Sequence, residues 1–175
     1  MTFHLPKIYP LTDVQLTGLS HAEQVRRLAL GGARVIQLRE KLMTGSQFYD
    51  AVTDAHRAAR EHGVTLIIND RVDIALAVGA DGVHLGQDDL PPHEARKLLG
   101  ANAIIGYSTH SLTQARKALS FPIDYIAIGP VFPTSTKADT APTIGLEGVS
   151  KVRRAIQEIH LVAIGGINEL NAASV

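Results

Sequence analysis

Tyr125-Ile126-Ala127-Ile128 is a short apolar run that predicts a buried strand, and Gly129-Pro130-Val131-Phe132-Pro133-Thr134-Ser135-Thr136-Lys137 follows it directly. The second stretch places two threonines and a lysine behind a Gly-Pro turn. Hydroxyl groups, loop amides and an ammonium group are the donors that bind phosphate. In parallel α/β folds, ligands bind in loops beyond the carboxyl ends of the strands. The two stretches therefore predict such a fold with a phosphate at this loop, although a polar surface loop has a similar composition.

The rest of the chain repeats this alternation of short apolar runs and amphipathic segments, which is typical of an α/β fold with a parallel sheet. Helix signals support the division: Ser20 is a predicted N-cap with Glu23 three residues later, and His62-Gly63 is a stop signal. The seven predicted strands are residues 8–11, 35–38, 65–68, 82–85, 104–107, 125–128 and 161–164. The predicted helices are residues 21–30, 46–61, 71–78, 92–99, 111–119 and 146–159, with a further helix start at 168–175.

The regular spacing of these elements predicts a TIM (β/α)8 barrel made by a single domain, residues 1–175. Such a barrel typically needs about 200 residues or more, and the pattern here falls one unit short. Because a barrel without its last strand leaves open edges, we expect the chain to be C-terminally incomplete and to lack the eighth β/α unit. A doubly wound open sheet and a barrel closed by another chain are the alternatives. Pro10-Leu11-Thr12-Asp13 is not the glycine-rich fingerprint of the open sheet.

Composition excludes several classes of function. The formal net charge is zero with neutral histidines, which argues against a nucleic-acid partner because such a partner requires a basic excess. The sequence contains no cysteine, so disulfides, zinc–thiolate sites and thiol chemistry are excluded. No apolar run approaches the roughly 20 residues that span a bilayer, and the N-terminus lacks a signal-peptide pattern. We therefore expect a cytoplasmic protein without a membrane partner.

Charged side chains follow the second predicted strand, in Gln37-Leu38-Arg39-Glu40-Lys41. Alternation along an extended chain places Gln37, Arg39 and Lys41 on one side. A guanidinium fork and an ammonium group both suit phosphoryl oxygens. In a barrel these groups face the mouth where the carboxyl ends of the strands meet. A solvated charge run at a strand end is the alternative.

Acidic residues follow the third and fourth predicted strands, in Asn69-Asp70-Arg71 and Gly86-Gln87-Asp88-Asp89. Two carboxylates at adjacent strand ends can share Mg²⁺, which prefers few carboxylates together with water and phosphate oxygens. Asp70 and Asp89 form the natural pair, and Asp88 is a competitor. The alternative is that these aspartates cap the helices that follow them.

The segments that follow the predicted strands together indicate two anionic ligands. Ser108 offers a hydroxyl group, and Gly166 lets backbone amides approach an anion. A pyrophosphate suits Arg39, Lys41, Ser108, Lys137 and the metal, whereas a monophosphate suits Thr134, Thr136 and Gly166. His84 lies inside an apolar strand and His110 precedes a helix, so neither is assigned as a general base. No activated serine or cysteine nucleophile is evident.

Six segments together resemble one enzyme family, thiamine phosphate synthase, over nearly the full length and in the same order. They are Gln37-Leu38-Arg39-Glu40-Lys41, Ile68-Asn69-Asp70-Arg71, Gly82-Val83-His84-Leu85-Gly86-Gln87, Gly106-Tyr107-Ser108, Gly129 to Lys137, and Ala163-Ile164-Gly165-Gly166-Ile167. The resemblance implies a transferase that joins a pyrimidine methyl diphosphate to a thiazole phosphate and releases pyrophosphate. It also implies a dissociative route, in which pyrophosphate leaves first and the thiazole nitrogen traps a pyrimidine-methyl cation.

By this resemblance, the catalytic residues are Arg39, Lys41, Ser108 and Lys137. The pyrimidine diphosphate is held by Gln37, Leu38, Arg39, Glu40, Lys41, Asn69, Ser108 and Lys137. The thiazole phosphate is held by Thr134, Ser135, Thr136 and Gly166, and Mg²⁺ by Asp70 and Asp89. The sequence does not give the oligomeric state, but family members commonly associate, so a homo-oligomer is one of the states that the resemblance allows. The family continues past Val175 into an eighth strand and helix that help to bind the thiazole phosphate.

Two other functions remain open from the sequence. A thiazole tautomerase of the same fold transfers protons and needs neither a diphosphate site nor a metal, so the set of Arg39, Lys41, Asp70, Asp89 and Lys137 disfavours it. A general-base role for His110 would favour the tautomerase. The second alternative is a non-catalytic barrel that only binds phosphate ligands.

Overall fold

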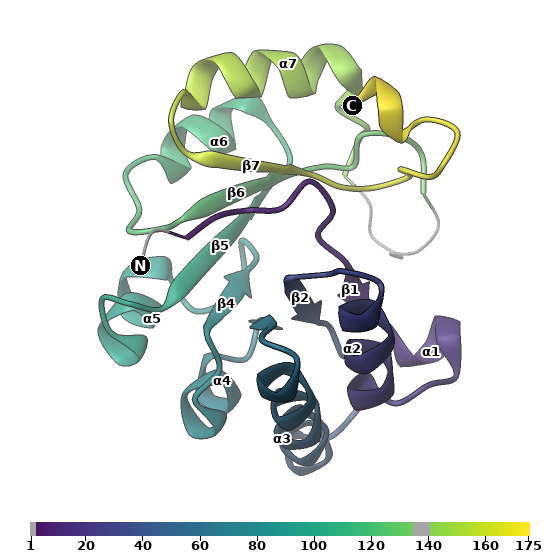
Figure 1. Ribbon diagram of the computed structural model, residues 1–175. Coiled ribbons are helices and arrows are strands. Elements are labelled where there is room, and N and C mark those ends of the chain that lie inside the picture. Colours follow the sequence, from purple (N-terminus) through teal and green to yellow (C-terminus); the bar gives the residue numbers. More distant parts are fainter. Residues whose placement is uncertain (1–2, 135–140) are drawn as a thin grey trace. The chain divides into compact units, whose positions relative to one another are not determined.

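The computed structural model describes residues 3–134 and 141–175 (Figure 1). These residues fold as two compact units. Unit 1 contains Met1–His84 and Glu94–Ile104, and unit 2 contains Leu85–His93 and Ile105–Val175. None of the helices in the described residues combines the length and apolar character that a membrane span requires.

Unit 1 contains parallel strands that are neighbours in sequence order. They are β1 (Leu11–Thr12), β2 (Val35–Leu38), β3 (Thr65–Asn69) and β4 (Gly82–Leu85), whose last residue belongs to unit 2. The register pairs Leu11 with Gln37, Gln37 with Ile67 and Ile67 with Gly82. Every residue of β2 and β4 is buried, as is typical of the strands of a parallel sheet.

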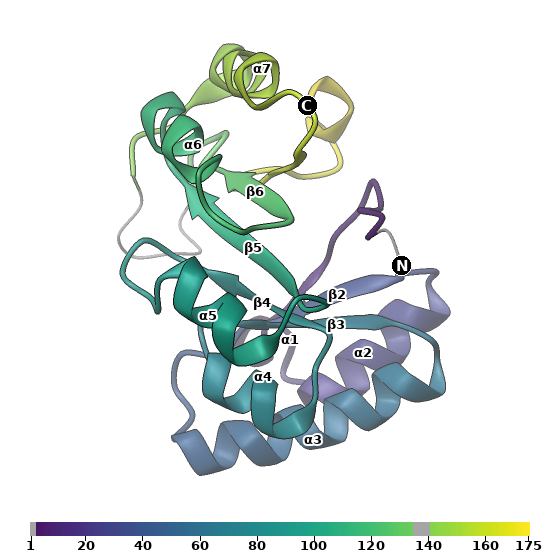
Figure 2. The same ribbon diagram turned by 90° about the vertical axis from the view of Figure 1, so that its left-hand side faces the viewer.

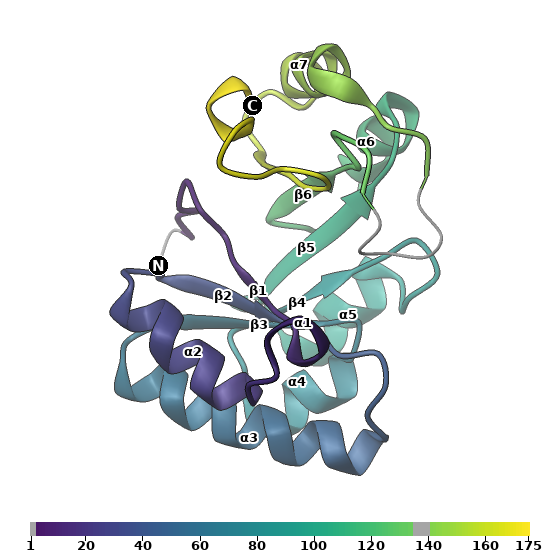
Figure 3. The same ribbon diagram turned by 90° about the vertical axis from the view of Figure 1, so that its right-hand side faces the viewer.

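The helices of unit 1 cover one face of this sheet (Figure 3). They are α1 (Val14–Thr17), α2 (His21–Leu30), α3 (Gly45–Glu61) and α4 (Val72–Val78), and most of α5 (Pro92–Leu99) belongs to the same unit. A doubly wound sheet carries helices on both faces and has its first strand in the interior of the strand order. The sequential strand order and the one-sided helix layer of unit 1 are those of a barrel wall instead.

Unit 2 continues the same alternation. Its parallel strands are β5 (Ile104–Thr109), which begins with the last residue of unit 1, β6 (Tyr125–Ile128) and β7 (His160–Ala163). Helices α6 (Leu112–Ala118) and α7 (Gly145–Ile156) pack together on one side of β6 and β7 (Figures 1 and 2), and a 3₁₀ turn, η1 (Ala172–Ser174), follows. The α/β class predicted from the sequence is confirmed in both units.

The N-terminal strand differs from the prediction. Residues 8–11 were expected to form it, but Ile8 is 79% exposed and pairing is confined to Leu11–Thr12. Pro10 has no N–H to donate, and the first contact is made by its carbonyl, which accepts from the Gln37 N–H over 3.0 Å. The short helix α1 was also not predicted. Asp13 caps it by accepting a hydrogen bond from the Leu16 N–H over 3.0 Å.

Candidate active site

The segment at the end of β2 divides into a buried half and an outer half. Gln37 is 3% exposed, and its Nε2 donates to the Tyr9 hydroxyl over 3.2 Å. Leu38 is fully buried, so its side chain is out of reach of a ligand. Arg39 is half-buried and Lys41 is exposed. The two cationic groups therefore lie where the strand meets solvent.

The structure brings two predicted site residues from different strand ends into contact. The Lys41 ammonium group forms an ion pair with the Asp70 Oδ2, although 29 residues separate them in the sequence. Their side chains are 52% and 19% exposed, respectively, so the pair is open to ligands. The predicted diphosphate-binding cation thus lies directly against the predicted metal ligand.

The backbone at Asp70 is unusual. Its φ is +62°, a left-handed conformation that aspartate adopts more readily than most residues. Its N–H donates to the His84 carbonyl over 2.8 Å. The N-cap of α4 is Arg71, and no side chain makes a capping hydrogen bond there. The alternative that Asp70 caps this helix is therefore wrong, and its carboxylate is directed at Lys41 instead.

Asn69 and His84 lie beside this pair. They are in register on β3 and β4 and are 8% and 7% exposed. Burial lowers the pKa of His84 to about 4, and the Asp70 charge opposes this shift. His84 is therefore a neutral, weakly basic group at neutral pH, in line with the expectation that it is not a general base.

In unit 2, Asp89 closes a tight turn after β4. Its Oδ2 accepts from the Gly86 N–H over 2.6 Å, and Asp89 is half-buried whereas Asp88 is exposed. Gln87 Nε2 donates to the Ser108 carbonyl over 2.5 Å, which joins this turn to β5. Burial raises the pKa of Tyr107, and the charges of Asp88 and Asp89 raise it further. The acidic turn and the Ser108 region therefore lie close together in this unit.

The Gly-Pro loop after β6 is anchored to the end of β7. The N–H groups of Val131 and Phe132 donate to the carbonyls of Ile164 and Gly165 over 3.0 and 2.9 Å. Gly166 has a φ of +67°, and a Cβ there would lie 2.6 Å from the Pro133 oxygen. The structure thus brings Gly166 against the loop that ends in Thr134. Ser135, Thr136 and Lys137 lie outside the described residues, so their positions remain predictions.

His110 has a defined orientation in this unit. Its Nδ1 lies 2.7 Å from the Gly129 carbonyl oxygen, which can only accept, so Nδ1 carries the proton. Its backbone N–H donates to the Gln114 Oε1 over 2.6 Å, and Ser111 caps α6. His110 therefore holds the start of the helix against the loop.

The predicted metal ligands are divided between the two units: Asp70 is in unit 1 and Asp89 in unit 2. Within residues 3–134 and 141–175, no group of three or more histidine, aspartate or glutamate side chains could hold a metal ion. The prediction therefore depends on two carboxylates that are completed by water and phosphate oxygens. The ion pair between the Lys41 ammonium group and the Asp70 Oδ2 fits a metal-binding role for Asp70, because this carboxylate already accommodates a cation.

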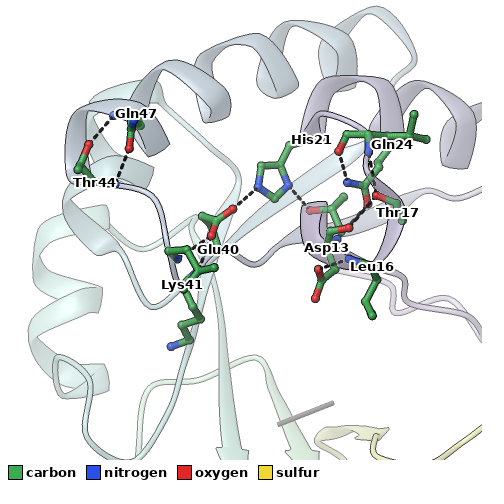
Figure 4. A network of polar contacts seen from close by, with 12 residues as sticks. Asp13, Leu16, Thr17, His21, Gln24, Glu40, Lys41, Thr44 and Gln47 are labelled. Atoms are coloured by element: carbon green, nitrogen blue, oxygen red, sulfur yellow. Dashed lines mark hydrogen bonds and ion pairs between the residues drawn. The ribbon is translucent and has the colours of Figure 1, made fainter. Parts of the chain in front are cut away.

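Sequence analysis missed a cluster behind the end of β2 (Figure 4). Thr12 and His21 are buried, and the His21 Nε2 faces the Glu40 carboxylate at 3.5 Å. Beside them is a hollow of about 400 Å³ between α1, the 40–43 loop and α3. Its lining residues are Val14, Gln15, Glu40, Leu42, Met43, Gln47 and Asp50. A histidine at the first position of a helix carries no local signal of this contact, because its partners come from other elements.

Comparisons with known proteins found similar sequences over most of this chain. A sequence model of the family described as thiamine monophosphate synthase matches residues 8–175. A thiamine-phosphate synthase of Chloroflexus aurantiacus is 46% identical over 170 residues, which cover 97% of this chain and 78% of the relative. A thiamine-phosphate synthase of Syntrophomonas wolfei is 49% identical over 165 residues, which cover 94% of this chain and 78% of the relative.

One solved structure is similar over almost all of the chain. It is a thiamine phosphate pyrophosphorylase from Pyrococcus furiosus, which is 40% identical and superposes with a TM-score of 0.83. The match covers 93% of this chain and 76% of that protein. It confirms the fold class predicted from the strand and helix spacing.

Proposed function

Since the chain belongs to the thiamine monophosphate synthase family, we propose that its strand-end side chains hold a pyrimidine methyl diphosphate and a thiazole phosphate. The chain condenses pyrimidine and thiazole moieties in thiamine biosynthesis, and it is a transferase. The observation that carries the assignment of residues is the contact between Lys41 and Asp70. The contact supports the proposal that a diphosphate-binding cation and a metal-binding carboxylate serve one ligand.

The proposed diphosphate side consists of side chains that stabilise charge on a leaving group. Arg39 and Lys41 bind phosphoryl oxygens as a fork and a point charge, and Ser108 and Lys137 add donors. When the diphosphate binds, Lys41 exchanges the Asp70 carboxylate for a phosphate oxygen. Asp70 and Asp89 would hold Mg²⁺, which supplies further positive charge to the departing pyrophosphate. Positive charge placed in advance in this way lowers the barrier to departure of an anion.

The proposed thiazole side consists of Gly166 and the loop from Thr134 to Thr136. The loop residues 131 and 132 are hydrogen-bonded to the end of β7, which holds the loop and Gly166 in a fixed relation. Orientation of the thiazole nitrogen behind the leaving pyrophosphate then makes the capture step effectively intramolecular. No protein nucleophile is required by this route. A cytoplasmic location and a homo-oligomeric state are also part of the proposal, and the family resemblance supports them.

The test is pyrophosphate release by the chain, given both substrates with Mg²⁺ and then with a chelator. We expect release only when both substrates and the metal are present. Asp70→Asn should lower metal-dependent release by roughly 100-fold, because it removes one of the two carboxylates proposed to hold the Mg²⁺ that stabilises the departing pyrophosphate. Asp73→Asn is the matched control. Asp73 is three residues from Asp70 and forms an exposed ion pair with Arg71, so its substitution removes an equal charge outside the proposed site. Equal rates for the two variants would remove Asp70 from the site.

A further inference from the structure

A buried polar chain lies directly behind the proposed diphosphate site. The Thr12 Oγ1 on β1 is 2.6 Å from the Nδ1 of His21, the first residue of α2. Thr12 is fully buried and His21 is 1% exposed. The other ring nitrogen of His21, Nε2, lies 3.5 Å from the Glu40 Oε2. The contacts thus run from β1 through α2 to a carboxylate in the loop after β2.

Glu40 is the link between this chain and the site. Its Oε1 accepts from the backbone N–H groups of Lys41 and Leu42, each over 2.7 Å. One carboxylate oxygen therefore holds the bend of the loop, while the other faces His21. Figure 4 shows the Glu40 carboxylate directed at the ring and the Lys41 side chain directed away from it.

The protonation states follow from burial and from the partners. Burial lowers the pKa of His21, and the carboxylates of Glu40 and Asp13 only partly oppose this. Burial raises the pKa of Glu40, but backbone N–H donors from the three following residues and His21 lower it more, so it lies below the ordinary value. At neutral pH a neutral ring thus faces a charged carboxylate. Since a carboxylate only accepts, the proton is on Nε2, and Nδ1 accepts from the Thr12 hydroxyl.

The His21 Nε2 is the detail that separates this arrangement from ordinary core packing. It is buried, and the 3.5 Å separation from Glu40 leaves it without a full hydrogen bond. Buried polar groups are almost always satisfied, so an unsatisfied one requires an explanation. The Phe48 ring, 6.1 Å away from the His21 ring between centroids, closes the other side of the pocket. The Nε2 thus faces the carboxylate that shapes the Arg39–Lys41 loop, at a distance too long for a full hydrogen bond.

We propose that Thr12, His21 and Glu40 form a positioning chain that sets the Arg39 and Lys41 side chains for the diphosphate. His21 and Thr12 touch no substrate in this arrangement and act only through Glu40. The inference rests on the proposed function, because it assigns the diphosphate to Arg39 and Lys41. It adds residues from β1 and α2 to the set on which the reaction depends.

The experiment is a calorimetric titration of the chain with inorganic pyrophosphate and Mg²⁺, together with steady-state kinetics. Thr12→Val and His21→Gln should each weaken pyrophosphate binding by about tenfold. Each removes the hydrogen bond between Thr12 and His21, and about tenfold is the effect of losing one hydrogen bond. They should leave the KM for thiazole phosphate unchanged. Thr12→Ser keeps the hydroxyl and should bind as the unaltered chain does. The ring-nitrogen NMR signals of His21 should report the Nε2–H form and should change in Glu40→Gln.

Phe48→Leu is the matched control, since it loosens the packing of the same ring without removing a polar group. It should lower thermal stability and leave pyrophosphate affinity unchanged. The proposal is overturned if Thr12→Val and His21→Gln bind pyrophosphate normally, or if Phe48→Leu weakens binding as much as they do. If the unaltered chain releases no pyrophosphate from its substrates, the proposed function fails. The titrations with inorganic pyrophosphate then still decide whether Thr12, His21 and Glu40 position an anion-binding site.

Discussion

Gly166→Ala should damage both the stability and the thiazole side of the site. Gly166 has a φ of +67°, and an added Cβ would lie 2.6 Å from the Pro133 oxygen and 2.7 Å from the Phe132 oxygen. Both are backbone atoms of a loop that is hydrogen-bonded to the end of β7. The loop cannot yield by rotating a side chain, so the backbone must move.

The magnitude can be worked out with the help of Gly18. Gly18 also has a φ of +67°, but nothing lies within 4 Å of the position its Cβ would take. Both substitutions therefore incur the same left-handed penalty of about 1–2 kcal/mol. In Gly166→Ala, the contact must also lengthen by roughly 0.8 Å to reach ordinary separation, and such overpacking costs about 1–3 kcal/mol more. The difference between the two variants should therefore be about 1–3 kcal/mol.

The assay combines urea unfolding, followed by circular dichroism, with pyrophosphate release at varied thiazole phosphate. Displacement of a site by about 1 Å can lower the rate about 100-fold, so kcat/KM for thiazole phosphate should fall by that order in Gly166→Ala. Gly18→Ala should keep the original value. Equal unfolding free energies for the two variants, with unchanged kinetics in both, would refute the argument from the loop contact.

Three further predictions concern Lys41, Lys137 and His21. Lys41→Met should tighten Mg²⁺ binding about 1.4- to 5-fold without substrate, because a partly exposed ion pair with Asp70 is worth about 0.2–1 kcal/mol; metal titration checks this. Lys137→Ala should slow pyrophosphate departure more than it weakens thiazole phosphate binding, as single-turnover rates and affinities would reveal. Burial holds the pKa of His21 below 6.5, so the unfolded chain takes up a proton first as pH falls below that value, and stability falls. His21→Gln should reduce this loss between pH 7 and pH 5 in urea unfolding.

Most of the secondary structure could be predicted because its signals are local. Residues 21–30, 92–99, 82–85 and 125–128 form elements with the predicted bounds. Ser20 caps its helix by accepting from the Glu23 N–H over 3.2 Å, as its position before an amphipathic segment indicates. The prediction of a strand at residues 8–11 was wrong in its bounds. An apolar run indicates a strand, but backbone pairing depends on which groups of the neighbouring strand are within reach, and here it is confined to Leu11–Thr12.

The candidate site was predicted as a set of strand-end residues and not as a set of contacts. The spacing of the strands was sufficient to gather Arg39, Lys41 and Asp70 at carboxyl ends. The ion pair between Lys41 and Asp70, and the left-handed backbone that aims the Asp70 carboxylate, depend on the parallel register of β2 and β3. The structure also excludes the helix-capping role that the sequence left open for Asp70, because Arg71 is the N-cap of α4.

The sequence by itself determined the order of strands and helices and the chemical types of side chain at each strand end, because both are written in short-range patterns of polarity and turn residues. Only the tertiary structure decided the chain from Thr12 through His21 to Glu40. These residues lie on β1, on α2 and after β2, and no spacing rule connects them. Burial removes their alternative partner, water, so each polar atom must find its partner among whatever the fold brings near.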